Sequence, residues 1–101
     1  MIGIDCIRAL KALGEETRLR MLGLLFRETL CVSAISERMK VSQYNASKHL
    51  RIMREAGLVQ TEKQGKLRLY TVSNDLKSHL KANGNIIDLG CCTFRLDKLP
   101  K

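Results

Sequence analysis

The sequence has 101 residues, and its 18 Lys and Arg side chains outnumber its 10 Asp and Glu side chains, which gives a formal net charge of +8 at pH 7. This length is enough for one hydrophobic core and too short for two, and a hydrophobic content of 45% excludes a disordered chain. Neither a membrane-spanning apolar run nor a secretory signal pattern is present, so we expect one cytoplasmic domain over residues 1–101 that does not engage a membrane.

Two helices are predicted at the start of the chain, over residues 4–13 and 16–27, with Gly14 between them. Apolar side chains recur in both at intervals of three or four residues, which is typical of a helix that buries one side. The side chains that we expect to face inward are Cys6, Ile7, Leu10 and Leu13 in the first helix and Leu19, Leu22, Leu25 and Phe26 in the second.

A short helix, a tight turn and a longer helix are predicted over residues 33–56. We expect the short helix at about residues 34–39 and the turn at residues 40–42. Ser42 is a favourable N-cap for the longer helix, because its hydroxyl can accept a backbone N–H that the first helical turn leaves unpaired. Gly57 can take the left-handed conformation that ends the helix.

The longer helix has two different faces. Its apolar arc consists of Ala46, Leu50, Met53 and Ala56. Its outer arc carries amide, hydroxyl and cationic side chains, namely Gln43, Tyr44, Ser47, Lys48, Arg51 and Arg54, with Glu55 as its one acid. Such groups can reach base edges and phosphates in a major groove, although a helix of a bundle could also be basic by chance.

The positive charge is concentrated in the middle of the chain. Seven basic and two acidic residues lie between Lys40 and Arg68, so this stretch contributes +5 of the net +8. A cluster of this kind is typical of a protein that neutralises phosphates.

The period then changes to that of strands. Residues 58–72 predict a hairpin around Gln64–Gly65, where Gly supplies the positive φ of a tight turn. Lys63, Lys66 and Arg68 lie at or near its tip, so it is a basic wing.

The last predicted helix follows the wing. Ser73 can cap it, and it spans residues 74–82 with Leu76 and Leu80 facing inward. Residues 83–85 break it, and the pattern leaves open the conformation of the tail over residues 84–101. The fold class is therefore mainly α with a β-hairpin wing, a winged helix-turn-helix.

Two stretches resemble a known family. Residues 12–27 and 41–59 are similar to the second helix and the recognition helix of the ArsR/SmtB metalloregulators, and matching positions extend over about residues 8–73. The resemblance implies a homodimeric repressor that pairs through its first and last helices and releases operator DNA when an inducer binds. Its two-fold symmetry predicts an inverted-repeat operator in double-stranded DNA.

The predicted DNA contacts need no cofactor. We expect Gln43, Tyr44, Ser47 and Lys48 to read the major groove, and the N-cap Ser42 to be a DNA-binding residue as well. We expect the phosphates to be held by Arg51, Arg54, Lys63, Lys66 and Arg68.

The family's usual inducer sites are incomplete. In the arsenic-responsive branch, a cysteine pair begins the third helix, whereas here Cys31 is matched but its partner position is Ser33, whose hydroxyl is a poor ligand for a soft metal. The zinc-sensing branch uses Asp and His pairs on the last helix, and the spacing of Asp75 and His79 does not fit. We therefore expect His79 to be a solvated helix residue, and His49 to pack or bond locally.

The adjacent thiols Cys91 and Cys92 are the best candidate inducer site. Trivalent arsenic is thiophilic, and sulfur-rich sites select soft species. The predicted inducer is therefore arsenic(III) or a related thiophile such as antimonite or a methylated arsenical. Trivalent arsenic commonly takes three thiolates, and the third would be Cys6, from the same or the other subunit, with Cys31 as second choice.

Other functions use the same residues. Cys31 could form a disulfide or polysulfide link with Cys91 or Cys92 in a sensor of oxidants or reactive sulfur, and any of the cysteines could simply fill the core. A winged-helix protein–protein module would not need the basic cluster, and a thiol metal buffer would leave the long helix unexplained. We expect no enzyme, because no nucleophile is paired with an oriented base.

Overall fold

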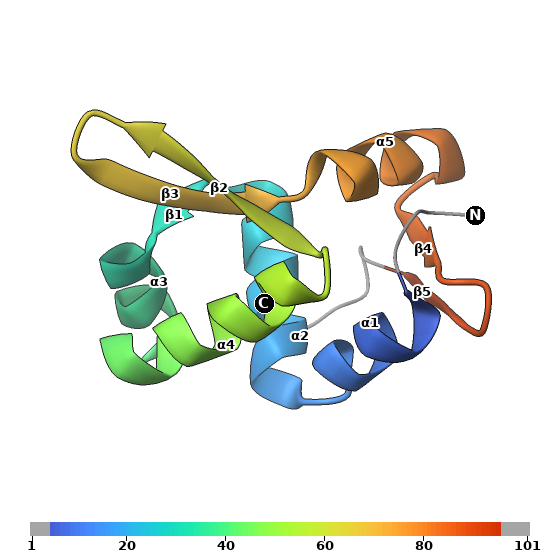
Figure 1. Ribbon diagram of the computed structural model, residues 1–101, viewed down its shortest axis with the longest axis horizontal. Coiled ribbons are helices and arrows are strands. Elements are labelled where there is room, and N and C mark those ends of the chain that lie inside the picture. Colours follow the sequence, from blue (N-terminus) through green and yellow to red (C-terminus); the bar gives the residue numbers. More distant parts are fainter. Residues whose placement is uncertain (1–4, 96–101) are drawn as a thin grey trace.

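The computed structural model describes residues 5–95 (Figure 1), which measure 35 × 26 × 22 Å along their principal axes. These residues form five helices and five short strands. The predicted architecture, mainly helical with a β-hairpin wing, is confirmed. No helix among them is long and apolar enough to cross a membrane. In chain order the elements are α1 (Cys6–Leu13), α2 (Glu16–Arg27), β1 (Leu30–Cys31), α3 (Val32–Met39), α4 (Gln43–Glu55), β2 (Val59–Gln64), β3 (Leu67–Val72), α5 (Asn74–Asn83), β4 (Ile86–Asp88) and β5 (Thr93–Arg95).

Helix α4 packs against the core through the apolar arc that was predicted from its sequence. Its inward side chains are almost fully buried, and they are Ala46, Leu50, Met53 and Ala56. Helix α2 contributes Met21, Leu22 and Leu25 to the same cluster, whereas Leu19 and Phe26 are only partly buried. Removing this apolar surface from water is the main force that holds the helices together.

Helix α1 buries only part of the predicted stripe, because Leu13 is buried and Cys6 packs against the core, but Ile7 and Leu10 do not face inward. Ala9, Ala12 and Leu13 are buried, whereas Leu10 is 39% exposed and Ile7 is 56% exposed. The physical reason is that small alanine side chains let α1 approach α2 and α4 closely, so its bulkier apolar side chains stay outside.

The predicted helix ends are confirmed at α4. Ser42 Oγ accepts a hydrogen bond from the backbone N–H of Asn45 at 3.1 Å, and Gly57 has a φ of +80°. Ser73 caps α5 in the same way, since its Oγ accepts the N–H of Leu76 at 3.2 Å. These caps fix where both helices begin.

The wing is a three-stranded antiparallel sheet in the order β1-β3-β2. Gln64 pairs with Leu67, so the two-residue loop is Gly65–Lys66, one residue later than predicted, and Gly65 has a φ of +63°. The hairpin of β2 and β3 projects from the helical body (Figure 1), which is why Leu67 is 55% exposed. The apolar link before α3 forms β1, and α3 begins at Val32, two residues earlier than predicted.

The tail contains a second hairpin that the sequence pattern left open. Strands β4 and β5 pair antiparallel, with Ile87 opposite Phe94. Ile87 and Leu89 are buried, so the hairpin is anchored in the core. Residues 96–101 of the predicted tail lie outside the described residues.

Candidate functional sites: a basic face and a sulfur cluster

The turn between α3 and α4 sets the direction of the recognition helix. Lys40 ends α3 in the left-handed conformation with a φ of +57°, and the Ser36 hydroxyl donates to the carbonyl of Val41 at 2.5 Å. The chain therefore turns within three residues, and the apolar arc of α4 packs inward while its polar face stays outside.

All the predicted DNA-contacting side chains lie in exposed positions, whether on α4 or on the wing. Four of those on α4 line a shallow hollow of about 270 Å³, namely Tyr44, Ser47, Lys48 and Arg51. The Tyr44 side chain is 78% exposed, although a phenol ring is costly to leave in water. An exposed ring beside two cations fits a surface that a partner covers.

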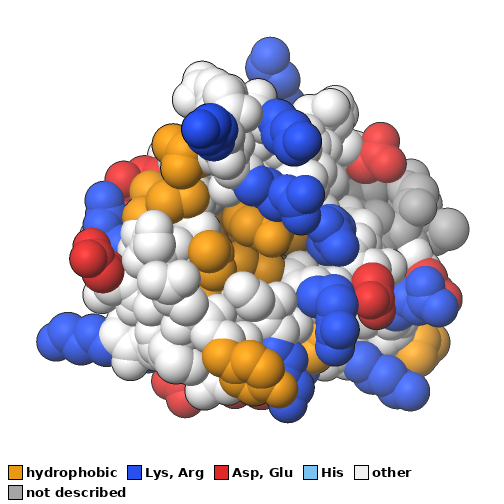
Figure 2. Space-filling view, turned by 60° about the vertical axis from the view of Figure 1, so that its left-hand side comes forward, with side chains coloured by type: hydrophobic (Ala, Val, Ile, Leu, Met, Phe, Trp, Pro, Cys, Tyr) orange, Lys and Arg blue, Asp and Glu red, His pale blue; other side chains and the backbone are white. Residues whose placement is uncertain are grey.

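Like charges oppose one another on the wing. Lys63 and Arg68 are directly paired across β2 and β3, an arrangement that repels unless an anion lies nearby. Figure 2 shows a band of Lys and Arg side chains on the face that carries the wing, with the Asp and Glu side chains mostly toward the edges of the view. This face therefore favours a polyanionic partner.

Three of the four cysteines come together at the other end of the molecule. Cys6, at the start of α1, is joined by a disulfide to Cys91, between β4 and β5. Their Cα atoms are 6.2 Å apart, and their sequence separation is 85. Cys92 Sγ lies 4.0 Å from Cys91 Sγ and is unpaired. We call Cys6, Cys91 and Cys92 the sulfur cluster.

The hairpin that carries this cluster is held against α5. His79 Nε2 accepts the backbone N–H of Asp88 at 2.8 Å, and Asp88 Oδ1 accepts the N–H of Gly90 at 2.9 Å. The prediction that His79 is merely solvated is therefore wrong, because the hairpin folds back onto α5 and meets its ring. The alternation of Ile87 and Leu89 just before Gly90 was the signal in the sequence for this hairpin.

Cys31 is separated from the sulfur cluster. It lies on β1, opposite Leu69 of the wing, and Figure 1 places β1 and the β4–β5 hairpin at opposite ends of the molecule. Its Sγ is 3.2 Å from Ser33 Oγ, and this hydrogen bond, together with the backbone N–H of Ala34, lowers the pKa of the Cys31 thiol. The predicted pairing of Cys31 with Cys91 or Cys92 is therefore not present in this structure.

Within residues 5–95, no group of three or more His, Cys, Asp or Glu side chains is arranged to hold a metal ion. A disulfide sulfur is not a thiolate ligand, so the cluster as it stands offers the Cys92 thiol alone. Reduction of the Cys6–Cys91 bond would leave three thiols at this place, a purely soft donor set.

A bridge that the sequence analysis missed connects α1 to α4. Arg18, near the start of α2, donates from Nε to the carbonyl of Ala12 at 2.5 Å and from its terminal nitrogen to His49 Nδ1 at 3.2 Å. His49 was predicted to pack or bond locally, and its ring instead bonds to Arg18, which is 31 positions earlier in the sequence. Because an arginine can only donate, Nδ1 of His49 must be the acceptor.

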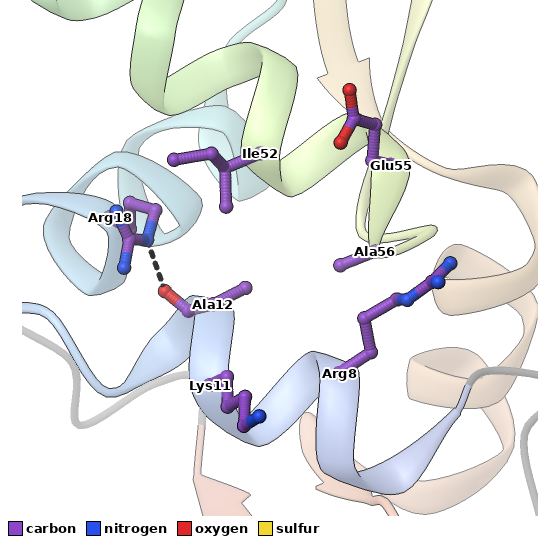
Figure 3. Close-up of a pocket in the computed structure, with 7 residues that line it drawn as sticks. All are labelled: Arg8, Lys11, Ala12, Arg18, Ile52, Glu55 and Ala56. Atoms are coloured by element: carbon purple, nitrogen blue, oxygen red, sulfur yellow. Dashed lines mark hydrogen bonds between the residues drawn. The ribbon is translucent and has the colours of Figure 1, made fainter.

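An open hollow of about 540 Å³ lies beside this bridge, between α1 and the end of α4 (Figure 3). Ala12, Ile52 and Ala56 form its apolar part, and Arg8 and Arg18 reach it from α1 and α2. Helix α1 thus meets α4 through a few small side chains and the Arg18 bridge, with space left between them.

Comparisons with known proteins agree with this architecture. A family profile described as bacterial regulatory protein, arsR family, matches residues 15–61. The chain is 40% identical over 65 residues to the transcriptional activator HlyU of Vibrio cholerae, covering 64% of this chain and 60% of that protein. It is 32% identical over 85 residues to the arsenical resistance operon repressor of Staphylococcus xylosus, covering 81% and 82%. A homodimeric winged helix-turn-helix DNA-binding domain of Mycobacterium bovis matches with a TM-score of 0.69 and 28% identity, covering 79% and 74%.

The fold and these relatives define the class of the protein. Its fold is a winged helix-turn-helix, and the relatives that it matches are named as transcriptional regulators. The chain belongs to the bacterial ArsR family, as the resemblance of its helices implied. The match to HlyU spans 60% of the length of that protein.

Proposed function

We propose that the protein is a cytoplasmic, homodimeric repressor that releases an inverted-repeat operator when trivalent arsenic binds to the sulfur cluster. The observation that carries the proposal is the gathering of Cys6, Cys91 and Cys92 at one place by two segments that are 85 positions apart in sequence. Antimonite or a methylated arsenical would use the same soft donors.

DNA binding uses the basic face. The N-terminal part of α4 enters the major groove, where side chains with amide, hydroxyl and amino groups meet base edges. The contacts with bases are made by Gln43, Tyr44, Ser47 and Lys48, next to Ser42, and those with phosphates by Arg51, Arg54, Lys63, Lys66 and Arg68.

The dimer forms through α1 and α5. Ile7 and Leu10 supply exposed apolar surface on α1, which water disfavours. The homodimeric state of the related Mycobacterium bovis domain supports a dimer. In such a dimer the two α4 helices would lie on the same side of the molecule, where each could enter the major groove of one operator half-site.

Arsenic binding requires the reduced cluster. Arsenous acid, As(OH)₃, exchanges its three hydroxyls for three thiolate sulfurs, and the three thiol protons leave with them as three waters, without a change of oxidation state. Cys91 and Cys92 chelate the arsenic as neighbours in the chain, and Cys6 of the same subunit is the third ligand. Cys31, the second choice by sequence, is too far away in this fold.

The signal reaches α4 through α1. Cys6 begins α1, Ala12 lies near its end, and the Arg18 bridge connects the Ala12 carbonyl to His49 on α4. A shift of α1 on arsenic binding therefore changes how α4 is held relative to the dimer. Coupling of this kind is typically worth ~1–3 kcal/mol, or about 5–150-fold in DNA affinity.

The test is the fluorescence anisotropy of a labelled duplex from upstream of the gene, titrated with arsenite in the presence of the reduced protein. Arsenite is expected to release the DNA from the wild type and from Cys31→Ser, but not from Cys92→Ser. Release that is equal in Cys92→Ser would contradict the proposal, and so would failure of the wild type to respond.

A second function is favoured by the disulfide itself. Formation of the Cys6–Cys91 bond joins α1 to the β4–β5 hairpin, so an oxidant or a reactive sulfur species could act on DNA binding through the same helix. In the anisotropy assay, release by hydrogen peroxide or by an organic polysulfide with arsenite inert would identify this thiol-redox sensor instead.

A further inference from the structure

We infer that oxidation and arsenic compete for the same thiols, so that the Cys6–Cys91 disulfide is a state of the protein that cannot bind arsenic. This inference rests on the proposed function, because it takes the sulfur cluster to be the arsenic site. It adds that the response to arsenic is gated by the redox state of one bond.

The geometry makes the two states mutually exclusive. The Cα atoms of Cys6 and Cys91 are 6.2 Å apart, within the range that a disulfide spans without movement of the backbone. The Cys92 sulfur is only 4.0 Å from that of Cys91, so Cys91 belongs both to the oxidised pair and to the adjacent chelating pair. Once Cys6 and Cys91 are joined, one thiol is left, and one thiol cannot chelate.

No other cysteine can replace the lost ligands. Cys31 is the other free thiol in the described part of the chain, and it lies on β1, paired with the wing strand β3. Figure 1 shows the wing and the β4–β5 hairpin at opposite ends of the molecule. The oxidised cluster therefore has no local way to regain a second thiolate.

The position of Cys91 suits it for the exchange between states. Cys91 is exposed between β4 and β5, whereas Cys6 and Cys92 are partly buried, and both pack against the hydrophobic core. An oxidant such as hydrogen peroxide takes two electrons and two protons from the Cys6 and Cys91 thiols, forms their S–S bond and leaves as two waters. A dithiol reverses the step by giving two electrons and two protons and becoming a disulfide itself. A phosphine reverses it with one water, which supplies the two protons, and leaves as the phosphine oxide.

The competition is tested by counting arsenic bound to the full chain by equilibrium dialysis. One sample is reduced with a phosphine that is then removed without air, and the other is oxidised with a stoichiometric amount of peroxide. We expect about one arsenite per chain in the reduced sample, none in the oxidised sample, and recovery after re-reduction.

The outcomes test the competition and the proposed arsenic site separately. Equal binding to both samples would overturn the competition and leave the proposed arsenic site standing. Absence of binding to the reduced sample would overturn the proposed function, and the competition with it. Loss in the oxidised sample that re-reduction does not reverse would also overturn the competition, because it would show damage beyond the disulfide.

Protection of the thiols from oxidation by bound arsenite gives an independent measurement. Arsenite at a concentration of about 100 times its Kd leaves about 1% of the sites free, so it should slow formation of the Cys6–Cys91 bond about 100-fold. The rate is followed by alkylation of the remaining thiols and mass spectrometry. Cys31→Ser should be protected like the wild type, whereas Cys92→Ser, which keeps both partners of the disulfide, should oxidise at a rate that arsenite changes far less. Oxidation of the wild type at the same rate with and without arsenite would overturn the inference.

Discussion

The two cysteines outside the disulfide have different surroundings, although both are thiols of similar exposure. Cys31 has a hydrogen-bonding hydroxyl at 3.2 Å and a lowered pKa, whereas Cys92 packs against the core beside the oxidised pair. The thiolate is the reactive form, so Cys31 should be the more reactive toward alkylating agents. The thiol with the lowered pKa, Cys31, is therefore not part of the cluster proposed to bind arsenic.

Replacing Ser33 by Ala should make Cys31 less reactive. The substitution removes the hydrogen bond that contributes most to the lowered pKa, so the pKa should rise and the thiolate should appear at a higher pH. The measurement is the rate of iodoacetamide alkylation of Cys31 against pH, followed by mass spectrometry. A profile identical to that of the wild type would show that Ser33 does not set the thiol's pKa, and the Cys92 profile in the same samples is the control.

Lys66→Ala should weaken DNA binding similarly for all sequences. Lys66 lies in the loop at the tip of the wing, where it can meet a phosphate but is not placed among the groups that read bases. Loss of one phosphate contact should reduce the slope of log K against log salt by about 0.9. The measurement is anisotropy at several salt concentrations, with Arg27→Ala on α2 as the control that removes one exposed positive charge away from the basic face. An unchanged slope for Lys66→Ala would remove Lys66 from the interface.

The roles of residues that depend only on close neighbours in the sequence could be predicted. Ser42 and Ser73 cap their helices as expected, because a cap depends on neighbours within three residues. His79 could not be predicted, because its partner is the backbone of Asp88 in a separate element. The exposure of the DNA-contacting side chains on α4 was predictable from the helical period, since they share one face of the helix.

At the level of elements, α4 depends on its N-cap. Ser42→Ala removes the acceptor for the N–H of Asn45 and should lower the free energy of unfolding by about 1 kcal/mol. Chemical denaturation measures the effect, with Ser47→Ala as the control, since Ser47 is exposed in the middle of the same helix. Equal stabilities of the two variants would show that the cap contributes nothing.

Arg18→Ala should separate arsenic binding from DNA release. It removes the bridge between the Ala12 carbonyl and His49 while leaving the sulfur cluster intact. Arsenite should therefore bind with unchanged affinity but release less DNA, which dialysis and anisotropy measure separately. Arg8→Ala is the matched control, since it lines the same hollow (Figure 3), and an Arg18→Ala protein with full release would exclude this route.

The elements that the sequence left uncertain are those with weak or mixed periodicity. In α1 the small side chains Ala9 and Ala12 form the buried stripe, and alanine carries little hydrophobic signal, so Ile7 and Leu10 misled the assignment. Strand β1 has two residues and is defined only by its pairing with Leu69 and Tyr70 of β3. The helices with long apolar side chains, such as α2 and α4, were predictable because their burial and their period agree.

At the scale of the whole molecule, the two sites lie at opposite ends. The basic face is formed by α4 and the wing, and the sulfur cluster by the start of α1 and the β4–β5 hairpin (Figure 1). The adjacent cysteines could be proposed as a site from sequence, but their approach to Cys6 depends on a contact between residues 85 positions apart, which no local pattern predicts. A sensor of this form needs the two ends to influence one another.

The most direct test of the account is the affinity of the reduced protein for arsenite, measured with and without saturating operator DNA. Because coupling is reciprocal, DNA should weaken arsenite binding by the same factor by which arsenite weakens DNA binding, about 5–150-fold. Equal arsenite affinities in the two conditions would contradict the account, since they would mean that the sulfur cluster binds arsenic without any effect on the basic face.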